Sequence, residues 1–162
     1  MFEEWQVLEA ILPWLVERGA IISQVSVAQN QSISVADQRD RVKRLLRELG
    51  HADVNFVSSG PDIVAAESGV TWKIECKGQK TSRKQETILN NFQRALASTV
   101  SYYTADDGTV RLGLAVPSYE AYLILLAQRV PAALQNRLDL RILLVDPETS
   151  TVLPWLEEEP QN

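Results

Sequence analysis

The sequence predicts an α/β protein in which a central mixed β-sheet is flanked by helices on both sides. Residues 60–78 read as two short strands joined by a tight turn. After this hairpin, amphipathic helical patterns alternate with short apolar runs typical of strands, which is the order expected when helices cover both faces of a sheet. A chain of 162 residues with 45% apolar residues is long enough for one domain with a sizeable core.

We expect a single domain, 1–162, made of an N-terminal helical part, 1–50, and a core, 51–155. Residues 3–18 predict an amphipathic helix, because apolar side chains recur at helical spacing, with glutamates early and an arginine late. Pro13 inside this pattern predicts a kink, or a helix that restarts there.

Residues 20–34 predict a strand followed by a loop. A second helix follows, with Ser34 or Asp37 as its cap and an end near Leu49. Its polar face is basic, and either faces solvent or contacts phosphates. The basic residues of this face are Arg39, Arg41, Lys43, Arg44 and Arg47.

The core is expected to open with a strand over 52–57, which leads into the hairpin. Strands are then predicted over 110–116 and 140–145, with a short edge piece at 152–155. A long helix should run to about Tyr103 and face the sheet with side chains at four-residue spacing, namely Ile88, Phe92, Leu96 and Val100. A further helix over 119–135 should be disturbed at Pro131.

The hairpin turn predicts which residues of the two strands face each other. If Ser68 and Gly69 are the two loop residues, Asp62 pairs with Glu75, and their Cβ atoms lie about 4.5–5.5 Å apart. Side chains alternate along a strand, so Glu75 and Lys77 share one face. The other face carries the apolar Trp72, Ile74 and Cys76.

Two carboxylates side by side repel each other unless a cation lies between them. Mg²⁺ is typically held by one or two carboxylates, with water and substrate phosphates as its other ligands. Asp62 and Glu75 therefore predict a metal site, with Lys77 beside it as a base or as a group that orients the nucleophile. The alternative is a solvated strand face on which Glu75 and Lys77 form a plain ion pair.

The motif Pro61-Asp62 followed by Glu75-Cys76-Lys77 resembles the PD-(D/E)xK nuclease superfamily, which has the restriction-endonuclease-like fold. The resemblance implies that Asp62, Glu75 and the backbone carbonyl of Cys76 bind the metal, and that Lys77 assists attack on phosphate. Several branches also place a glutamine near the metal, on the helix after the lysine strand. Gln93 looks like that residue, with Gln85 and Gln79 as competing candidates, although Ala97 stands where the fuller pattern has a tyrosine.

A longer set of segments is similar to the cyanobacterial XisH family, the fdxN-element excision controlling factors, over residues 62–155. The segments are DIVAAESG…WKIECK, ALASTVSYY, LGLAVP and LLVDPETSTVLPW. Gly78-Gln79 follows Lys77 where that family usually has Ser-Phe, and the N-terminal helices look longer. The resemblance therefore indicates kinship rather than identity.

The net charge of −5 argues against a nucleic-acid partner, but the charges are unevenly distributed. Residues 39–94 hold eleven basic and seven acidic residues, against five and fourteen in the rest of the chain. A basic centre of this kind can bind phosphates locally, with modest and salt-sensitive affinity. The nucleic-acid contacts are expected at Lys80, Arg83, Lys84 and Arg94.

The leading hypothesis from the sequence is an enzyme, a DNA endonuclease that depends on Mg²⁺ or Mn²⁺, from a restriction, repair or mobile-element setting. The alternative is a catalytically silent module with the same fold that binds DNA or protein. Glu9 or Glu48 could complete the metal site, and a homodimer or a small accessory protein could complete the recognition of DNA. The chain has no apolar run long enough to cross a bilayer, and its acidic start is unlike a signal peptide, so a cytoplasmic location is expected.

Overall fold

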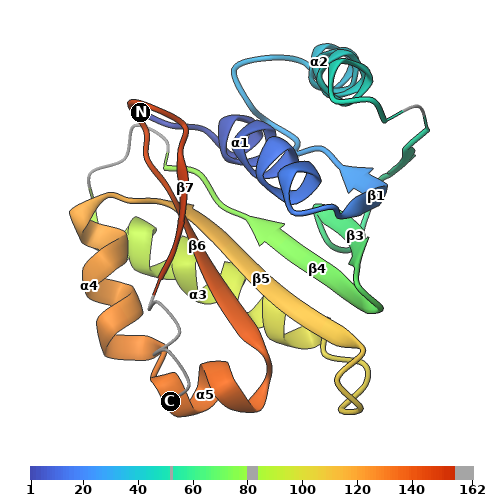
Figure 1. Ribbon diagram of the computed structural model, residues 1–162. Helices are drawn as coiled ribbons and strands as arrows, with labels where there is room; N and C mark the ends of the chain where they lie inside the picture. The colour runs from blue at the N-terminus through green and yellow to red at the C-terminus, as the bar shows by residue number, and fades with distance from the viewer. Residues whose placement is uncertain (52, 80–83, 156–162) are drawn as a thin grey trace.

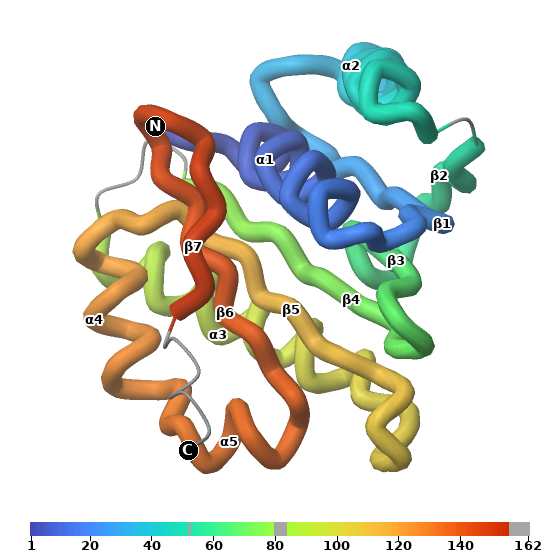
Figure 2. The backbone as a smooth tube through the Cα atoms, viewed as in Figure 1, coloured from blue at the N-terminus to red at the C-terminus, as the bar shows by residue number. Residues whose placement is uncertain are grey.

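The computed structural model describes residues 1–51, 53–79 and 84–155, and its centre is a mixed sheet of seven strands. The strands lie in the order β2-β1-β3-β4-β5-β6-β7, and Figure 2 shows β2 at the edge beyond β1. The strands are β1 (Ile21–Ser26), β2 (Asn55–Val57), β3 (Ile63–Glu67), β4 (Val70–Cys76), β5 (Val110–Pro117), β6 (Leu140–Val145) and β7 (Val152–Pro154).

Helices cover both faces of this sheet. They are α1 (Glu4–Glu17), α2 (Val35–Glu48), α3 (Gln85–Ser101), α4 (Glu120–Arg129) and α5 (Ala132–Arg137). Figure 1 shows α1 in front of the sheet and α3 behind it. The α/β class with a helix-flanked mixed sheet is therefore confirmed.

The hairpin between β3 and β4 has the register that its turn predicts. Ser68 and Gly69 both have positive φ, 50° and 82°, the combination of a type I′ turn that matches strand twist. Glu67 pairs with Val70, and Ile63 pairs with Ile74. The next pair along this register is Asp62 with Glu75, so the expected facing of the two carboxylates is confirmed.

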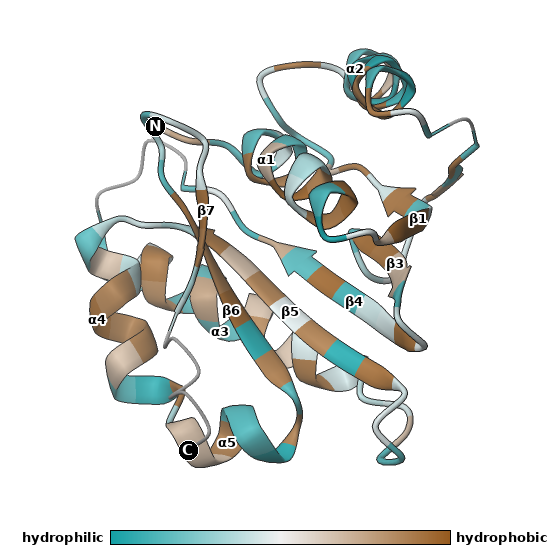
Figure 3. Cartoon of the chain, viewed as in Figure 1, coloured by the Kyte–Doolittle hydropathy of each residue, from teal (hydrophilic) through white to brown (hydrophobic). Residues whose placement is uncertain are grey.

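The strands after the hairpin run parallel, with helices as crossovers. The pairs β4–β5 and β5–β6 are parallel, and α3 connects β4 to β5. Both β5 and β6 are apolar over most of their length, as Figure 3 shows, because both of their faces are buried. Gly113 of β5 lies so close to Ile74 that an added Cβ would stand 2.8 Å from Cγ1 of that side chain.

Two apolar cores lie on opposite faces of the sheet. The first joins α1 and α2 to β3 and β4, with Trp72, Ile74 and Cys76 buried as the alternation predicts. The second joins α3 and α4 to β5 and β6, around Phe92 and Tyr122. The other face of β4, which carries Glu75, is thus turned toward α3.

The expected buried face of the long helix is wrong in its second half. Ile88 and Phe92 are buried, but Ala95 and Thr99 continue the stripe, while Val100 is 37% exposed. A four-residue repeat drifts by about 40° per step around a helix of 3.6 residues per turn, so Val100 has rotated away from the sheet.

Several element boundaries also differ from expectation. The helix over residues 3–18 does not restart at Pro13, and α1 runs without interruption because Leu12 and Leu15 on either side are buried against the sheet. Ser34 is the cap of α2. The strand expected over 52–57 is shorter, and the helix expected to be disturbed at Pro131 is divided there into α4 and α5.

Within the described ranges, no helix is both long and apolar enough to cross a membrane.

Candidate active site at the carboxyl end of strand β4

Asp62 stands directly before β3 and faces the end of β4. Its Oδ2 accepts a hydrogen bond from the Cys76 backbone N–H at 2.7 Å, and its own carbonyl accepts one from Ser26 at 2.9 Å. As a residue Asp62 is half-buried, but neighbouring groups enclose its carboxyl group. Burial raises the pKa of Asp62 well above its usual range, and the charges of Glu75 and Glu4 raise it further.

Glu75 projects from β4 toward α3, where it meets a tyrosine that sequence reasoning missed. The hydroxyl of Tyr102, at the end of α3, donates a hydrogen bond of 2.8 Å to Glu75 Oε2. Burial raises the pKa of Glu75, and the hydrogen bond from Tyr102 offsets part of that rise. Tyr102 therefore fixes the side chain of one of the two carboxylates.

A third carboxylate, Glu4, lies beside this pair. Its Oε2 stands 2.8 Å from Nζ of Lys77, in an ion pair in which both side chains are mostly buried. Glu4 also raises the pKa of both Asp62 and Glu75 by its charge. Glu9 and Glu48 do not take this place, because Glu9 is bound to Arg41 and Glu48 is exposed on α2.

Glu4 reaches the end of β4 because the start of the chain is attached there. Phe2 and Gln79 form an antiparallel bridge with two backbone hydrogen bonds, of 2.7 and 3.2 Å. Gly78 permits the close approach, since a Cβ at this position would lie 2.3 Å from the Glu4 nitrogen. No local sequence signal marks Glu4, because its neighbourhood is made by residues more than seventy positions away.

The charged groups open into a cavity of about 480 Å³ between the start of α1, the loop after β1, and α3. Glu4 and Lys77 line it, and Arg94 from α3 lines it as expected for a phosphate contact. Gln93 does not line it, because it lies on the exposed side of α3. The prediction of Gln93 as a residue near the metal is therefore not supported.

The other residues expected to contact nucleic acid lie at the start of α3 or before it. Lys84 is exposed and is the N-cap residue of α3. Lys80 and Arg83 lie outside the described residues.

Comparison with known proteins gives a fold. No protein-family model matches the sequence, and no curated protein matches it. A fdxN element excision controlling factor protein from Anabaena variabilis matches with a TM-score of 0.51 and 19% identity, over 94% of this chain and 98% of the other. An XisH family protein from Nostoc punctiforme matches with a TM-score of 0.49 and 18% identity, over 95% and 98%. The chain shares the fold of the Anabaena protein.

The donor set at the site suits a hard divalent cation. Among the described residues, no three His, Cys, Asp or Glu side chains converge closely enough to form a metal-binding group. Mg²⁺ needs only one or two carboxylates, and buried carboxyl groups with raised pKa values indicate a site that lacks positive charge. Asp62 and Glu75, with the Cys76 carbonyl and Glu4 close by, fit Mg²⁺ or Mn²⁺.

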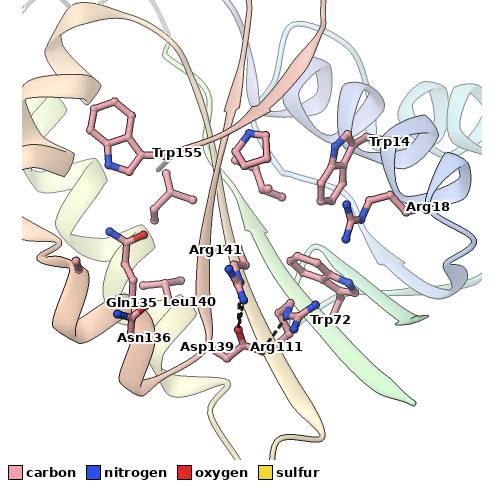
Figure 4. Close-up of a pocket in the computed structure, with 14 residues that line it drawn as sticks. Trp14, Arg18, Trp72, Arg111, Gln135, Asn136, Asp139, Leu140, Arg141 and Trp155 are labelled. Atoms are coloured by element: carbon pink, nitrogen blue, oxygen red, sulfur yellow. Dashed lines mark hydrogen bonds and ion pairs between the residues drawn. The ribbon is translucent and has the colours of Figure 1, made fainter. Parts of the chain in front are cut away.

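A larger cavity, of about 880 Å³, lies at the opposite end of the parallel strands. Figure 4 shows Arg111 and Arg141 pointing toward Asp139 at its centre, and the two ion pairs measure 2.8 and 3.0 Å. Arg111 also stacks over Trp72. Because Asp139 is held between two arginines, this cavity shows none of the carboxylate crowding at the end of β4.

Proposed function

We propose that this protein is a divalent-metal-dependent DNA endonuclease that hydrolyses phosphodiester bonds. The observation that carries the proposal is the enclosed pair Asp62 and Glu75 with raised pKa values beside Lys77, in a cavity that also holds Arg94. Perturbed acids of this kind gather at functional sites more often than in structural ion pairs. A purely structural hairpin would gain stability by losing one of these two carboxylates.

The motif supports the same function. Asp62, Glu75 and Lys77 occupy the positions that the resemblance to PD-(D/E)xK nucleases assigns to metal binding and catalysis, on what we take to be a restriction-endonuclease-like fold. The Anabaena protein that shares the fold is called an excision controlling factor, which favours a mobile-element setting over restriction or repair. We propose a cytoplasmic location, with DNA as substrate and a second copy or a small accessory protein as partner.

Each residue of the site has a role in this proposal. Asp62, Glu75 and the Cys76 carbonyl hold Mg²⁺ or Mn²⁺, and Glu4 adds negative charge beside them. When bound, the metal supplies Lewis acidity that offsets the charge developing on the phosphate. Lys77 orients the attacking water with its ammonium group, which Glu4 holds in place at 2.8 Å. Arg94 contacts a neighbouring phosphate.

The test is cleavage of supercoiled, linear, branched and single-stranded DNA, with Mg²⁺, with Mn²⁺ and with chelator. The parent should cut at least one substrate in either metal and none in chelator. Asp62→Asn should be inactive and should bind Mg²⁺ far more weakly in calorimetry, while its asparagine oxygen can still accept the Cys76 N–H. Metal affinity equal to that of the parent would contradict the two-carboxylate site.

A catalytically silent module that binds DNA or protein is the second candidate. Lys77 already has a partner in Glu4, and the net charge of −5 disfavours strong DNA binding without help. This candidate expects no cleavage of any substrate in either metal. It gains most if Mg²⁺ binding is also absent.

A further inference from the structure

The cavity at the end of β4 is lined by an unusual number of carboxamide side chains. Five come from three separate segments, the loop after β1, the residue after Gly78, and the middle of α3. They are Gln29, Asn30, Gln31, Gln79 and Asn91. Carboxamides carry both hydrogen-bond donors and acceptors, so a cavity lined by them suits a ligand with a polar edge.

Two of these side chains carry carbonyl oxygens that have no hydrogen-bond partner. Oε1 of Gln31 and Oε1 of Gln79 are both inaccessible to solvent and unpaired. Two further unpaired atoms, in Gln38 and Arg39, belong to residues outside the cavity lining. Buried acceptors are normally paired, because leaving one unmet costs its full desolvation penalty. The cavity therefore lacks hydrogen-bond donors that a ligand could bring.

The two glutamines are held in place before any ligand arrives. Gln79 is fixed by its backbone bridge to Phe2. Gln31 precedes Ser32, whose N–H donates to Glu3 Oε2 at 3.0 Å, and Glu3 opens α1. Preorganised polar groups of this kind lower the cost of binding and give specificity.

We propose that this cavity binds one unstacked nucleobase that carries an exocyclic amino group, with adenine as the best match. An amide pairs with adenine in bidentate fashion, since its carbonyl accepts from the amino group while its NH₂ donates to a ring nitrogen. Thymine has no amino group and leaves an amide oxygen unmet. A volume of about 480 Å³ is within the range of small-ligand sites.

The charges around the cavity place the phosphates of the same strand. Lys77 and Arg94 line it together with the amides. The base would thus belong to a nucleotide next to the phosphate at Asp62 and Glu75. The inference rests on the proposed function for the choice of DNA as the strand, but not for the hydrogen bonding itself.

The test measures the binding of labelled single-stranded oligo-dA and oligo-dT by fluorescence polarisation, at low salt and in chelator so that no strand is cut. The parent should bind oligo-dA about tenfold more tightly than oligo-dT, the size of one bidentate amide–base pair. Gln31→Met and Gln79→Met keep the bulk of the side chain and remove the amide. Each should lose most of the preference for dA while still binding oligo-dT.

Melting temperature separates recognition from a structural role. Removing an unmet buried acceptor should leave the free protein as stable as the parent or more so. Matched controls are Asn90→Ala and Gln93→Met, because both amides are exposed on α3 and lie outside the cavity. Both controls should keep the preference for dA.

Three outcomes would overturn the inference. They are equal binding of oligo-dA and oligo-dT by the parent, a preference that survives in both Gln→Met cavity variants, and a lower melting temperature in those variants, which would show that the amides serve the fold. A preference for dA that depends on Gln31 and Gln79 supports the inference even if the protein cuts no DNA. Cleavage without such a preference supports the nuclease alone.

Discussion

At the scale of single residues, the charges at the end of β4 form a balance that one substitution can shift. Asp62, Glu75 and Glu4 are three carboxylates served by one ammonium group, that of Lys77. Lys73, four residues earlier on the same face, is used differently, since it donates to Thr104 Oγ1 at 2.8 Å. The two lysines thus offer a matched pair for mutation.

Lys77→Ala should lower the cleavage rate by roughly 10²–10⁴-fold, the usual weight of a positioned acid or base, while Mg²⁺ and DNA still bind. Lys77→Arg should not restore the rate, because guanidinium is larger and stays protonated. Lys73→Ala should cut like the parent. If Lys77→Ala also cuts like the parent, then Lys77 is only the ion-pair partner of Glu4.

The raised pKa values of Asp62 and Glu75 predict how stability of the metal-free protein depends on pH. A carboxyl group whose pKa is higher in the folded state binds its proton more tightly there, so its contribution to stability falls as pH rises above about 4 through the raised pKa. The lowered pKa values of Asp107 and Asp146 act in the opposite sense and at lower pH.

Asp62→Asn should therefore lose less melting temperature than the parent between pH 5 and pH 8 in chelator, pH values chosen as roughly bracketing the shift. The difference near pH 8 is on the order of 1 kcal/mol, or roughly 2–4 °C for a chain of this size. Asparagine is preferred to alanine because alanine would leave the Cys76 N–H without its acceptor. Parallel pH profiles for parent and variant would show that the two carboxyl groups do not interact.

At the scale of elements, the candidate site is assembled where elements begin and end. Asp62 precedes β3, Lys77 follows β4, Glu4 opens α1, and Tyr102 closes α3. Such positions are set by how elements dock on one another. Gly78 is the point at which the docking of α1 on β4 is tightest.

Gly78→Ala should displace the start of α1 and with it Glu4. Its Cβ would lie 2.3 Å from the Glu4 nitrogen and 2.4 Å from the Glu3 carbonyl carbon, and neither backbone atom can move alone. We expect the stability to fall by about 1–3 kcal/mol and cleavage to be abolished at temperatures where the variant is folded. Circular dichroism melting and the DNA assay measure the two effects.

Gly69→Ala is the control for this variant. The residue has φ of +82° but open space around its Cβ, at the far end of the hairpin. It should lower stability by about 1 kcal/mol through backbone strain alone and keep the activity of folded protein. Equal loss of activity in both variants would mean that destabilisation, rather than the position of Glu4, explains the effect.

At the scale of the whole molecule, an acidic chain carries a local basic region next to the cavity. The net charge is −5, yet Arg94 lines the cavity and Lys84 is exposed at the start of α3. Long-range repulsion and local attraction therefore oppose each other when DNA approaches. The balance should make binding modest and strongly dependent on salt.

Neutralising Lys84 and Arg94 together, each to glutamine, should weaken DNA binding about equally for all sequences. The slope of log affinity against log salt should become shallower by roughly one unit for each phosphate that the variant no longer neutralises. Arg129→Gln with Arg137→Gln makes a control of equal charge change, because both residues are exposed and neither lines the cavity. An unchanged slope in the first variant would place the DNA path elsewhere.

The sequence alone determined the features that depend on neighbours along the chain. The turn at Ser68 and Gly69 sets the register of β3 and β4, and with it the facing of Asp62 and Glu75, because a two-residue turn leaves one way to pair the strands. The alternation along β4 likewise separated the apolar face around Trp72 from the charged one. These relations are local, within a single hairpin.

The tertiary structure decided what depends on docking between distant segments. Glu4, Tyr102 and the amide-lined cavity meet β4 only because α1, α3 and the loop after β1 pack at its end. The same packing left Gln93 on the outer side of α3 and attached Glu9 to Arg41. Helical periodicity gives the spacing of a face, but the direction in which that face points is set by the sheet against which the helix is buried.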